Sequence, residues 1–342
     1  MKRMLHLLLA ALALLLVVPA LLLLAAAVRL RHVPFAIPAR DRPPASLALS
    51  QGFGAGGAPA ALHAAREPPG LRLRYLGISG YELTDGRTVV LLDPTVTRPG
   101  LFELLGGPLR PDEALGARLC PRADFILVNH AHYDHALDVP AIALRTGATV
   151  LGSRSTCNLA LSRGVPPGKV REVRPGESLA LGGFAVMVRA ARHARLLGSS
   201  RLLAGTIPRE AGKLWFFEYL QDATLSFRLE AAGASVWFHP TSTYEAGELG
   251  GLAAGTLILG VTGERITPAK AAAIIAEAKP ERVLPTHYDN FFQPLEKGLA
   301  LLSEADLEAA RRSVLAADPR LSWYVLEYGE AVRLPPDGAS PP

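Results

Sequence analysis

The chain has 342 residues and 49% hydrophobic composition, which is long enough for one large domain to bury most of its apolar surface without disulfide staples. Its formal net charge of +5 comes from the first 50 residues, because residues 51–342 contain 30 basic and 30 acidic side chains. A nucleic-acid-binding protein carries its basic excess on the folded domain, so we expect no nucleic-acid partner. The two cysteines, Cys120 and Cys157, exclude a disulfide framework, and two buried thiols are favoured over a bridge.

The N-terminal segment is strongly apolar. Residues 7–28 form an unbroken apolar run of 22 residues between basic residues on both sides. A helix needs about 20 residues to cross the hydrocarbon core of a membrane, whereas a cleavable signal has an apolar region of roughly 7–15. We therefore expect residues 1–31 to be a transmembrane anchor, with a cleaved signal as the alternative. The resulting prediction is a single-pass membrane protein whose folded domain lies on the extracytoplasmic side.

After this segment, the prolines and glycines of residues 32–69 predict a linker. Short strands interspersed with helices then fill residues 70–335, which predicts one α/β domain before a tail at 336–342. Helices are expected over residues 139–145, 154–162, 267–278 and 303–317, with Thr267 and Ser303 as N-caps. In chain order, strands are expected over residues 71–76, 81–84, 88–92, 124–129, 148–151, 170–173, 184–190, 213–219, 224–231, 235–238, 256–259, 282–284, 322–328 and 331–334, the last two as a hairpin.

A dense cluster of metal-binding residue types follows the strand expected at 124–129. The segment His130-Ala131-His132-Tyr133-Asp134-His135 packs three imidazoles and one carboxylate into six residues. In a loop that leaves a strand, His130 and His132 can share one face, while Asp134 and His135 serve a second centre. Imidazole and carboxylate are natural zinc ligands, and a catalytic zinc site leaves one position open for water. The sequence therefore predicts a metal site here.

The hexapeptide resembles the HxHxDH signature of the metallo-β-lactamase superfamily. The text around residues 75–77, 92–94 and 284–289 is also similar to that superfamily, and the closest similarity is to the branch with ascorbate-phosphate lactonase and N-acyl phosphatidylethanolamine phospholipase D. The resemblance implies an αββα four-layer sandwich over about residues 70–335. It also implies a hydrolase that uses a zinc-bound hydroxide to cleave an ester, lactone or phosphodiester, with one or two Zn²⁺ ions.

The same resemblance implies roles for individual residues. His130, His132 and His193 would hold the first metal, and Asp134, His135 and His287 the second. Asp134 would in addition be catalytic, because it can orient the attacking water or accept its proton.

One position departs from the superfamily pattern. Thr241 stands where a bridging aspartate is usual, and a neutral hydroxyl is a weak ligand. His239, two residues earlier, is an alternative ligand or a polar residue at a strand end. Asp93 and Asp289 are candidates to orient a ligand imidazole.

The substrate is weakly specified by the sequence. Tyr244 and Arg195 are candidate substrate-binding residues, and Arg195 belongs to an arginine-containing stretch, residues 194–212, that favours an anionic substrate if it forms a lid. The membrane segment adds a lipid to the small-molecule substrates considered. Two alternatives remain open: a non-catalytic metal-binding sensor, suggested by Thr241, and a di-iron redox protein, which His132 disfavours because that branch commonly has glutamate there.

Overall fold

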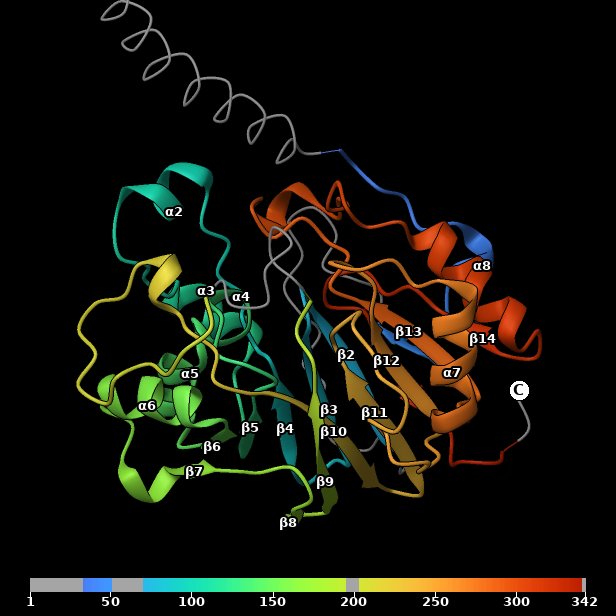
Figure 1. Cartoon of the computed structure of the whole chain (residues 1–342), viewed down its shortest axis with the longest axis horizontal. Coiled ribbons are helices and arrows are strands. Elements are labelled where there is room, and N and C mark those ends of the chain that lie inside the picture. The colour runs from blue at the N-terminus through green and yellow to red at the C-terminus, as the bar shows by residue number, and fades with distance from the viewer. Residues whose placement is uncertain (1–32, 51–69, 195–202, 340–342) are drawn as a thin grey trace, which may run out of the picture.

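A computed structural model describes residues 33–50, 70–194 and 203–339 of the chain. Two mixed β-sheets pack face to face, and helices cover their outer faces (Figure 1). Tyr81 of one sheet lies 6.3 Å from Phe238 of the other, measured between ring centroids, so the sheets contact each other directly. This arrangement confirms the predicted two-sheet α/β fold of the metallo-β-lactamase type.

The first sheet has eight strands in the order β1-β15-β2-β3-β4-β5-β6-β7. Its pairs are antiparallel from β1 to β4 and parallel from β4 to β7. The strands of this sheet are β1 (Ala48–Ser50), β2 (Leu71–Gly77), β3 (Gly80–Thr84), β4 (Val89–Leu92), β5 (Phe125–Leu127), β6 (Thr149–Gly152), β7 (Val170–Glu172) and β15 (Ala331–Leu334).

The second sheet has seven strands in the order β14-β13-β12-β11-β10-β9-β8. It is antiparallel from β8 to β11 and parallel from β11 to β14, so it repeats the mixed pattern of the first. Its strands are β8 (Ser178–Leu181), β9 (Phe184–Ala191), β10 (Thr224–Ala231), β11 (Ala234–His239), β12 (Thr256–Gly260), β13 (Arg282–Thr286) and β14 (Ser322–Trp323).

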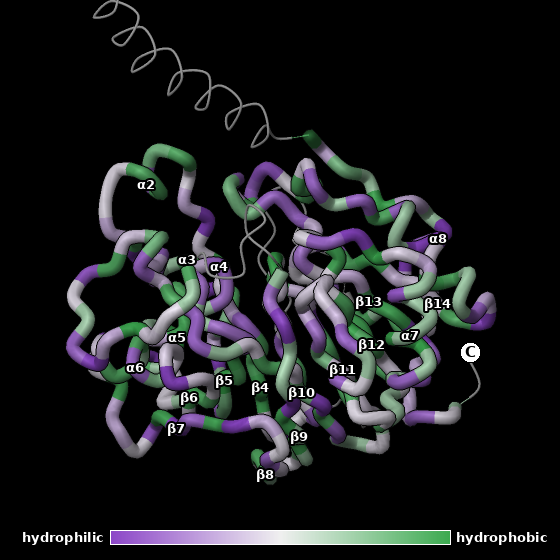
Figure 2. Tube along the Cα trace, in the orientation of Figure 1, coloured by the Kyte–Doolittle hydropathy of each residue, from purple (hydrophilic) through white to green (hydrophobic). Residues whose placement is uncertain are grey.

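Helices flank the two sheets. In Figure 1, α3, α4, α5 and α6 lie outside the first sheet, and α7 and α8 lie outside the second. The helices are α2 (Leu101–Gly106), α3 (Glu113–Leu119), α4 (Tyr133–Ala136), α5 (Val139–Thr146), α6 (Arg154–Ser162), α7 (Pro268–Ala278) and α8 (Leu307–Ala317), with 3-10 turns η1 (Ala39–Asp41), η2 (Pro167–Lys169), η3 (Phe216–Glu218) and η4 (Leu295–Lys297). Figure 2 shows that the hydrophobic stretches concentrate in strands such as β4, β5 and β13, where burial on both faces favours continuous apolar runs.

The predicted transmembrane helix requires a correction. The segment predicted to form it, residues 7–28, lies outside the described residues, and no helix within the described ranges is long and apolar enough to cross a membrane. The longest described helices, α7 and α8, have 11 residues each, whereas a span needs about 20. The fold-class prediction is therefore correct for the α/β domain and wrong for the transmembrane helix, and the single-pass membrane localisation that rested on this helix is not supported.

Residues 33–50, which fall in the predicted linker, lie against the domain. The Phe35 amide donates to the Leu299 carbonyl at 2.9 Å, and the Arg333 amide donates to the Leu47 carbonyl at 2.8 Å. Asp41 is buried and accepts a 2.8 Å hydrogen bond from Nε of Arg311.

Three predicted elements differ from the structure. The aromatic segment 213–219 contains the 3-10 turn η3 instead of a strand, because the Glu218 carboxylate accepts from the Trp215 amide at 2.8 Å and closes a turn. Helix α8 begins after Asp306, which caps the Ala309 amide, and not at Ser303. The predicted C-terminal hairpin does not form, because β14 pairs with β13 while β15 pairs with β2 in the other sheet. The predicted cap of α7 by Thr267 is confirmed.

Candidate metal centre

The predicted ligands lie where strands of both sheets end. The segment containing His130 follows β5, His193 follows β9, and His287 directly follows β13. Carboxyl ends of parallel strands meet at one edge of a sheet, which is where α/β proteins assemble their sites. Three stretches of chain that are far apart in the sequence therefore converge at one end of the sandwich.

Three imidazoles form the first group. The candidate ligand atoms of His130, His132 and His193 all lie within 4.8 Å of one another. Nε2 of His130 lies 3.1 Å from Nδ1 of His132. The Nδ1 atom of His193 donates to the Ala194 carbonyl at 2.6 Å, which leaves its Nε2 as the ligand atom.

The hydrogen bonds behind the rings support a cation between them. Nδ1 of His130 donates to Oδ1 of Asn129 at 2.5 Å, so its Nε2 carries a lone pair. Nε2 of His132 lies 3.4 Å from the Leu203 carbonyl, which turns its Nδ1 lone pair toward His130. Two lone pairs 3.1 Å apart repel each other unless a cation or a proton lies between them. A tetrahedral zinc ion with nitrogen ligands at about 2.0–2.1 Å separates two such nitrogens by about 3.3 Å, so the donor set fits zinc.

The second group combines a carboxylate with two imidazoles. The candidate ligand atoms of Asp134, His135 and His287 lie within 4.8 Å of one another. Oδ2 of Asp134 lies 3.1 Å from Nε2 of His287 and 3.5 Å from Nε2 of His135. The Nδ1 atom of His287 is buried and has no hydrogen-bond partner in the described part of the chain.

Burial keeps the first group neutral. Burial, reinforced by neighbouring imidazoles, lowers the pKa of His130 well below its usual value and lowers the pKa of His132 to about 4. Burial also lowers the pKa of His193. Neutral imidazoles keep the lone pairs that a metal ion requires.

Charge coupling dominates the second group. Burial raises the pKa of Asp134, but His135 and His287 outweigh it, so the pKa falls well below the usual carboxyl range. Burial lowers the pKa of His135, but Asp134 and Asp93 outweigh it, so the pKa rises. The carboxylate of Asp134 is therefore ionised at neutral pH.

Asp93, a candidate to orient a ligand imidazole, contacts the ring of His135. Its Oδ2 accepts from Nδ1 of His135 at 2.7 Å, and its Oδ1 accepts from the Asn129 amide at 2.6 Å. Asp93 has φ 41 and His287 has φ 59, and such left-handed conformations of non-glycine residues cluster at functional sites.

His239 and Thr241 do not join either group. Nε2 of His239 donates to the Thr243 carbonyl at 3.1 Å, and its Nδ1 accepts from the Ser226 hydroxyl at 2.7 Å. The Thr241 hydroxyl donates to the Arg192 carbonyl at 2.7 Å. Both side chains thus bind protein groups, and neither supplies the bridging carboxylate that is usual in the superfamily.

The remaining candidates are dispersed. Asp289 accepts from Tyr75, Tyr328, the Ile78 amide and Arg98, and no imidazole of the described residues is among these hydrogen-bond partners. The hydroxyl of Tyr244 lies 3.4 Å from the Ala273 carbonyl of α7, away from the two groups. Arg195 lies outside the described residues.

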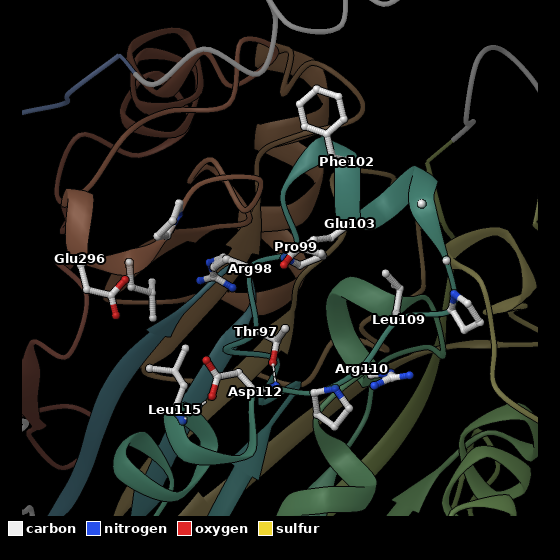
Figure 3. A pocket seen from close by; sticks show the side chains of 16 residues that line it. Thr97, Arg98, Pro99, Phe102, Glu103, Leu109, Arg110, Asp112, Leu115 and Glu296 are labelled. Carbon is white, nitrogen blue, oxygen red and sulfur yellow. Dashed lines mark hydrogen bonds between the residues drawn. The ribbon is translucent and has the colours of Figure 1, made fainter.

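Both groups open into one cavity of about 450 Å³. Apart from the six candidate ligands, its walls are largely apolar, and they include Leu104, Tyr133, Leu203, Phe216, Phe291, Phe292 and Leu302. A larger cavity of about 720 Å³ lies beneath α2 and is drawn in Figure 3. Its charged lining residues do not include any of the six candidate ligands, so the smaller cavity is the candidate site.

The sequence reasoning missed two features of this site. Asn129 accepts a hydrogen bond from the ring of His130, and its position directly before the hexapeptide in the sequence could have indicated this contact. Phe291 and Phe292 line the cavity, and their place shortly after His287 was the corresponding signal. Both predicted buried cysteines are free and buried.

Comparisons with known proteins identify the family of the domain. Residues 88–288 match the family described as beta-lactamase superfamily domain. A UPF0173 metal-dependent hydrolase of Symbiobacterium thermophilum is 45% identical over 83 residues, which are 24% of this chain and 32% of that protein. Another, of Pyrobaculum arsenaticum, is 24% identical over 265 residues, covering 77% of this chain and 100% of that protein. The solved structure of Igni18, a novel metallo hydrolase of Ignicoccus hospitalis, has 20% identity and a TM-score of 0.51, and covers 78% of this chain and 98% of that one.

Proposed function

This chain belongs to the metallo-β-lactamase superfamily, because residues 88–288 match its domain, and from that premise we propose a zinc-dependent hydrolase of ester, lactone or phosphodiester bonds. It is a metal-dependent hydrolase, as its full-length relative in Pyrobaculum arsenaticum is described. The proposal rests above all on two groups of three ligand atoms that converge in one cavity.

We assign His130, His132 and His193 to one zinc ion and Asp134, His135 and His287 to a second. When bound, zinc polarises a carbonyl or phosphoryl oxygen and lowers the pKa of water to about 7. Asn129 and Asp93 hold the rings of His130 and His135 in the orientation that binding requires. The ionised carboxylate of Asp134 would orient the attacking water.

Metal analysis combined with one variant pair tests this proposal. The purified chain is expected to hold one or two equivalents of zinc and to hydrolyse members of a panel of 4-nitrophenyl esters and phosphodiesters. His132→Ala is expected to lose zinc and to lower kcat/KM more than about a hundredfold. His239→Gln, a substitution at a histidine outside both groups, is expected to retain zinc and activity. Full activity in His132→Ala contradicts the proposed function.

The second candidate function is a non-catalytic metal-binding sensor. It is favoured by Thr241, whose hydroxyl is committed to the Arg192 carbonyl and which brings no charge to the site. Stoichiometric zinc with no turnover on the whole panel would support the sensor over the hydrolase.

A further inference from the structure

The cavity above the two ligand groups has walls that suit an uncharged molecule. We infer that the substrate is a neutral ester or lactone whose group beyond the scissile bond is apolar, an inference that rests on the proposed hydrolase function. This inference differs from the anionic substrate expected from residues 194–212. It is based on the side chains that line the cavity.

One wall is aromatic and lies against a candidate ligand. The ring of Phe291 stands nearly perpendicular to the ring of His287, with centroids 5.6 Å apart. Phe292 follows at 4.5 Å from Phe291, and Leu302 lines the cavity beside them. Phenylalanine side chains offer large apolar area without a hydrogen-bonding group. This wall therefore stabilises an apolar substituent directly beside the reacting bond.

Other parts of the chain continue the apolar lining. Leu104 comes from α2, Phe216 from η3, and Leu203 from the segment before η3. The Leu109 amide donates to the Leu214 carbonyl at 2.8 Å, which ties the segment after α2 to the one before η3. The segments next to Leu104 and Phe216 are thus joined by a backbone hydrogen bond.

Positive charge is lacking in the described part of this lining. No lysine or arginine is among the described cavity residues, and outside the six candidate ligands the charged residue is the exposed Glu304. Two basic groups of the described residues near the site pair with acids outside the lining: Lys270 with Glu264 at 2.9 Å, and Arg98 with Asp289 at 3.4 Å. A negative charge on the part of the substrate that lies beyond the metal ions would lose its hydration without gaining a counter-ion from the described walls, which is costly.

A pair of substrates that differ only in remote charge tests the inference. The metal-loaded protein is assayed with 4-nitrophenyl butyrate and mono-4-nitrophenyl succinate, which share the scissile bond and the four-carbon acyl chain, while the succinate ends in a carboxylate. We expect kcat/KM for the butyrate to exceed that for the succinate by at least about tenfold. Equal or faster hydrolysis of the succinate overturns the inference.

A matched pair of variants locates the preference. Phe292→Arg places a cation in the cavity and is expected to shift the ratio toward the succinate by about tenfold or more. Phe102→Arg is the control, because Phe102 is 90% exposed and projects from α2 away from the residues around it (Figure 3), outside the candidate site. Phe216→Arg repeats the cavity test if Phe292→Arg does not fold. A ratio that none of the cavity variants changes overturns the inference.

A non-hydrolysable pair separates this inference from the proposed function. The ketones 1-(4-nitrophenyl)butan-1-one and 4-(4-nitrophenyl)-4-oxobutanoic acid carry the same two tails and contain no ester, and their binding is measured by equilibrium dialysis. Tighter binding of the neutral ketone without hydrolysis of either ester retains the preference of the cavity for a neutral apolar ligand and removes the proposed hydrolysis. Tighter binding of the keto acid, or binding of neither ketone, overturns the inference.

Discussion

Nδ1 of His135 lies 2.7 Å from Oδ2 of Asp93, and the other oxygen of that carboxylate accepts from the Asn129 amide at 2.6 Å. Asn129 in turn accepts, through Oδ1, from Nδ1 of His130. The Asp93 carboxylate, directly after β4, therefore holds the ring of His135 in the second group. It also binds the backbone of Asn129, whose side chain holds the ring of His130 in the first group. Such contacts behind the ligands set both tautomer and ring direction.

The Asp93 carboxylate provides the first prediction. Asp93→Asn is expected to weaken zinc binding about 10- to 100-fold, because the amide cannot accept from both donors and hold His135 as the carboxylate does. Asparagine tolerates the φ of 41 at this position, so the backbone need not change. Competition with a chromogenic chelator measures the affinity.

The control for Asp93→Asn is Asp124→Asn. Asp124 also accepts from a backbone amide, that of Val89 at 2.8 Å, but it lies outside the candidate site. Its substitution is expected to leave zinc affinity unchanged. Equal affinities in the wild type and Asp93→Asn would contradict an orienting role for Asp93.

The Thr241 hydroxyl provides the second prediction. It donates to the Arg192 carbonyl at 2.7 Å and accepts from the Thr243 amide at 3.2 Å, so it joins the end of β9 to the loop after β11. Thr241→Val is expected to lower the free energy of unfolding by about 1–2 kcal/mol and to leave the zinc stoichiometry unchanged. Thr241→Ser retains the hydroxyl and is expected to restore most of that stability. Loss of a zinc equivalent in Thr241→Val alone would instead make Thr241 a ligand.

The residues of the two candidate ligand groups could be found in the sequence because most of their signal is local. Three imidazoles and a carboxylate within residues 130–135 have few structural explanations, and strand ends then identify His193 and His287 as partners. The hydrogen-bond partners of residues such as Asp289 depend on the direction of the side chain and were not predictable from the sequence. Asp289 was expected to face an imidazole, but the chain reverses at His287, where φ is 59, and this breaks the alternation of side chains along β13.

The arrangement of strands was predictable only in part. Most strands were found from their apolar pattern, but the pairing of the C-terminal ones was not. β14 and β15 are close in sequence and belong to different sheets, which no local pattern reveals. The Tyr328 hydroxyl, between them, donates to Asp289 at 3.0 Å, so a tertiary contact decides the path of the chain there.

Asp289 gives the third prediction, on stability. Its buried carboxylate accepts from the Tyr75 hydroxyl at 2.7 Å, the Ile78 amide at 2.8 Å and the Tyr328 hydroxyl, and it pairs with Arg98 at 3.4 Å. Asp289→Asn is expected to cost about 3–5 kcal/mol of unfolding free energy, because it leaves Arg98 as an uncompensated buried charge.

The same substitution is expected to reach the candidate site. The Ile78 carbonyl accepts from the His287 amide at 2.6 Å, so disturbing Ile78 is expected to displace a candidate ligand of the second group. Urea denaturation measures the stability and chelator competition measures zinc binding. Tyr328→Phe removes one donor and is the milder comparison, expected to cost about 1 kcal/mol. If Asp289→Asn and Tyr328→Phe lower the free energy of unfolding equally, the Asp289 carboxylate contributes no more than a single hydrogen bond, which contradicts the prediction.

The buried ring of His239 gives the fourth prediction, on pH. Burial, with a contribution from Lys270, lowers the pKa of His239 to about 4, below the value of about 6.5 of an unfolded chain. Between these two values, the unfolded chain binds a proton at this histidine and the folded chain does not, which lowers the free energy of unfolding. The free energy of unfolding is therefore at its full value above pH 6.5 and decreases as the pH falls toward 4. The loss is on the order of 3 kcal/mol.

His239→Gln keeps a donor for the Thr243 carbonyl and does not titrate. We therefore expect the stability difference between wild type and His239→Gln, from urea midpoints between pH 7.5 and 4.5, to shift in favour of the variant as the pH falls. The candidate ligand histidines contribute equally to both proteins. A difference that is constant over this range would mean that His239 does not remain neutral in the folded chain.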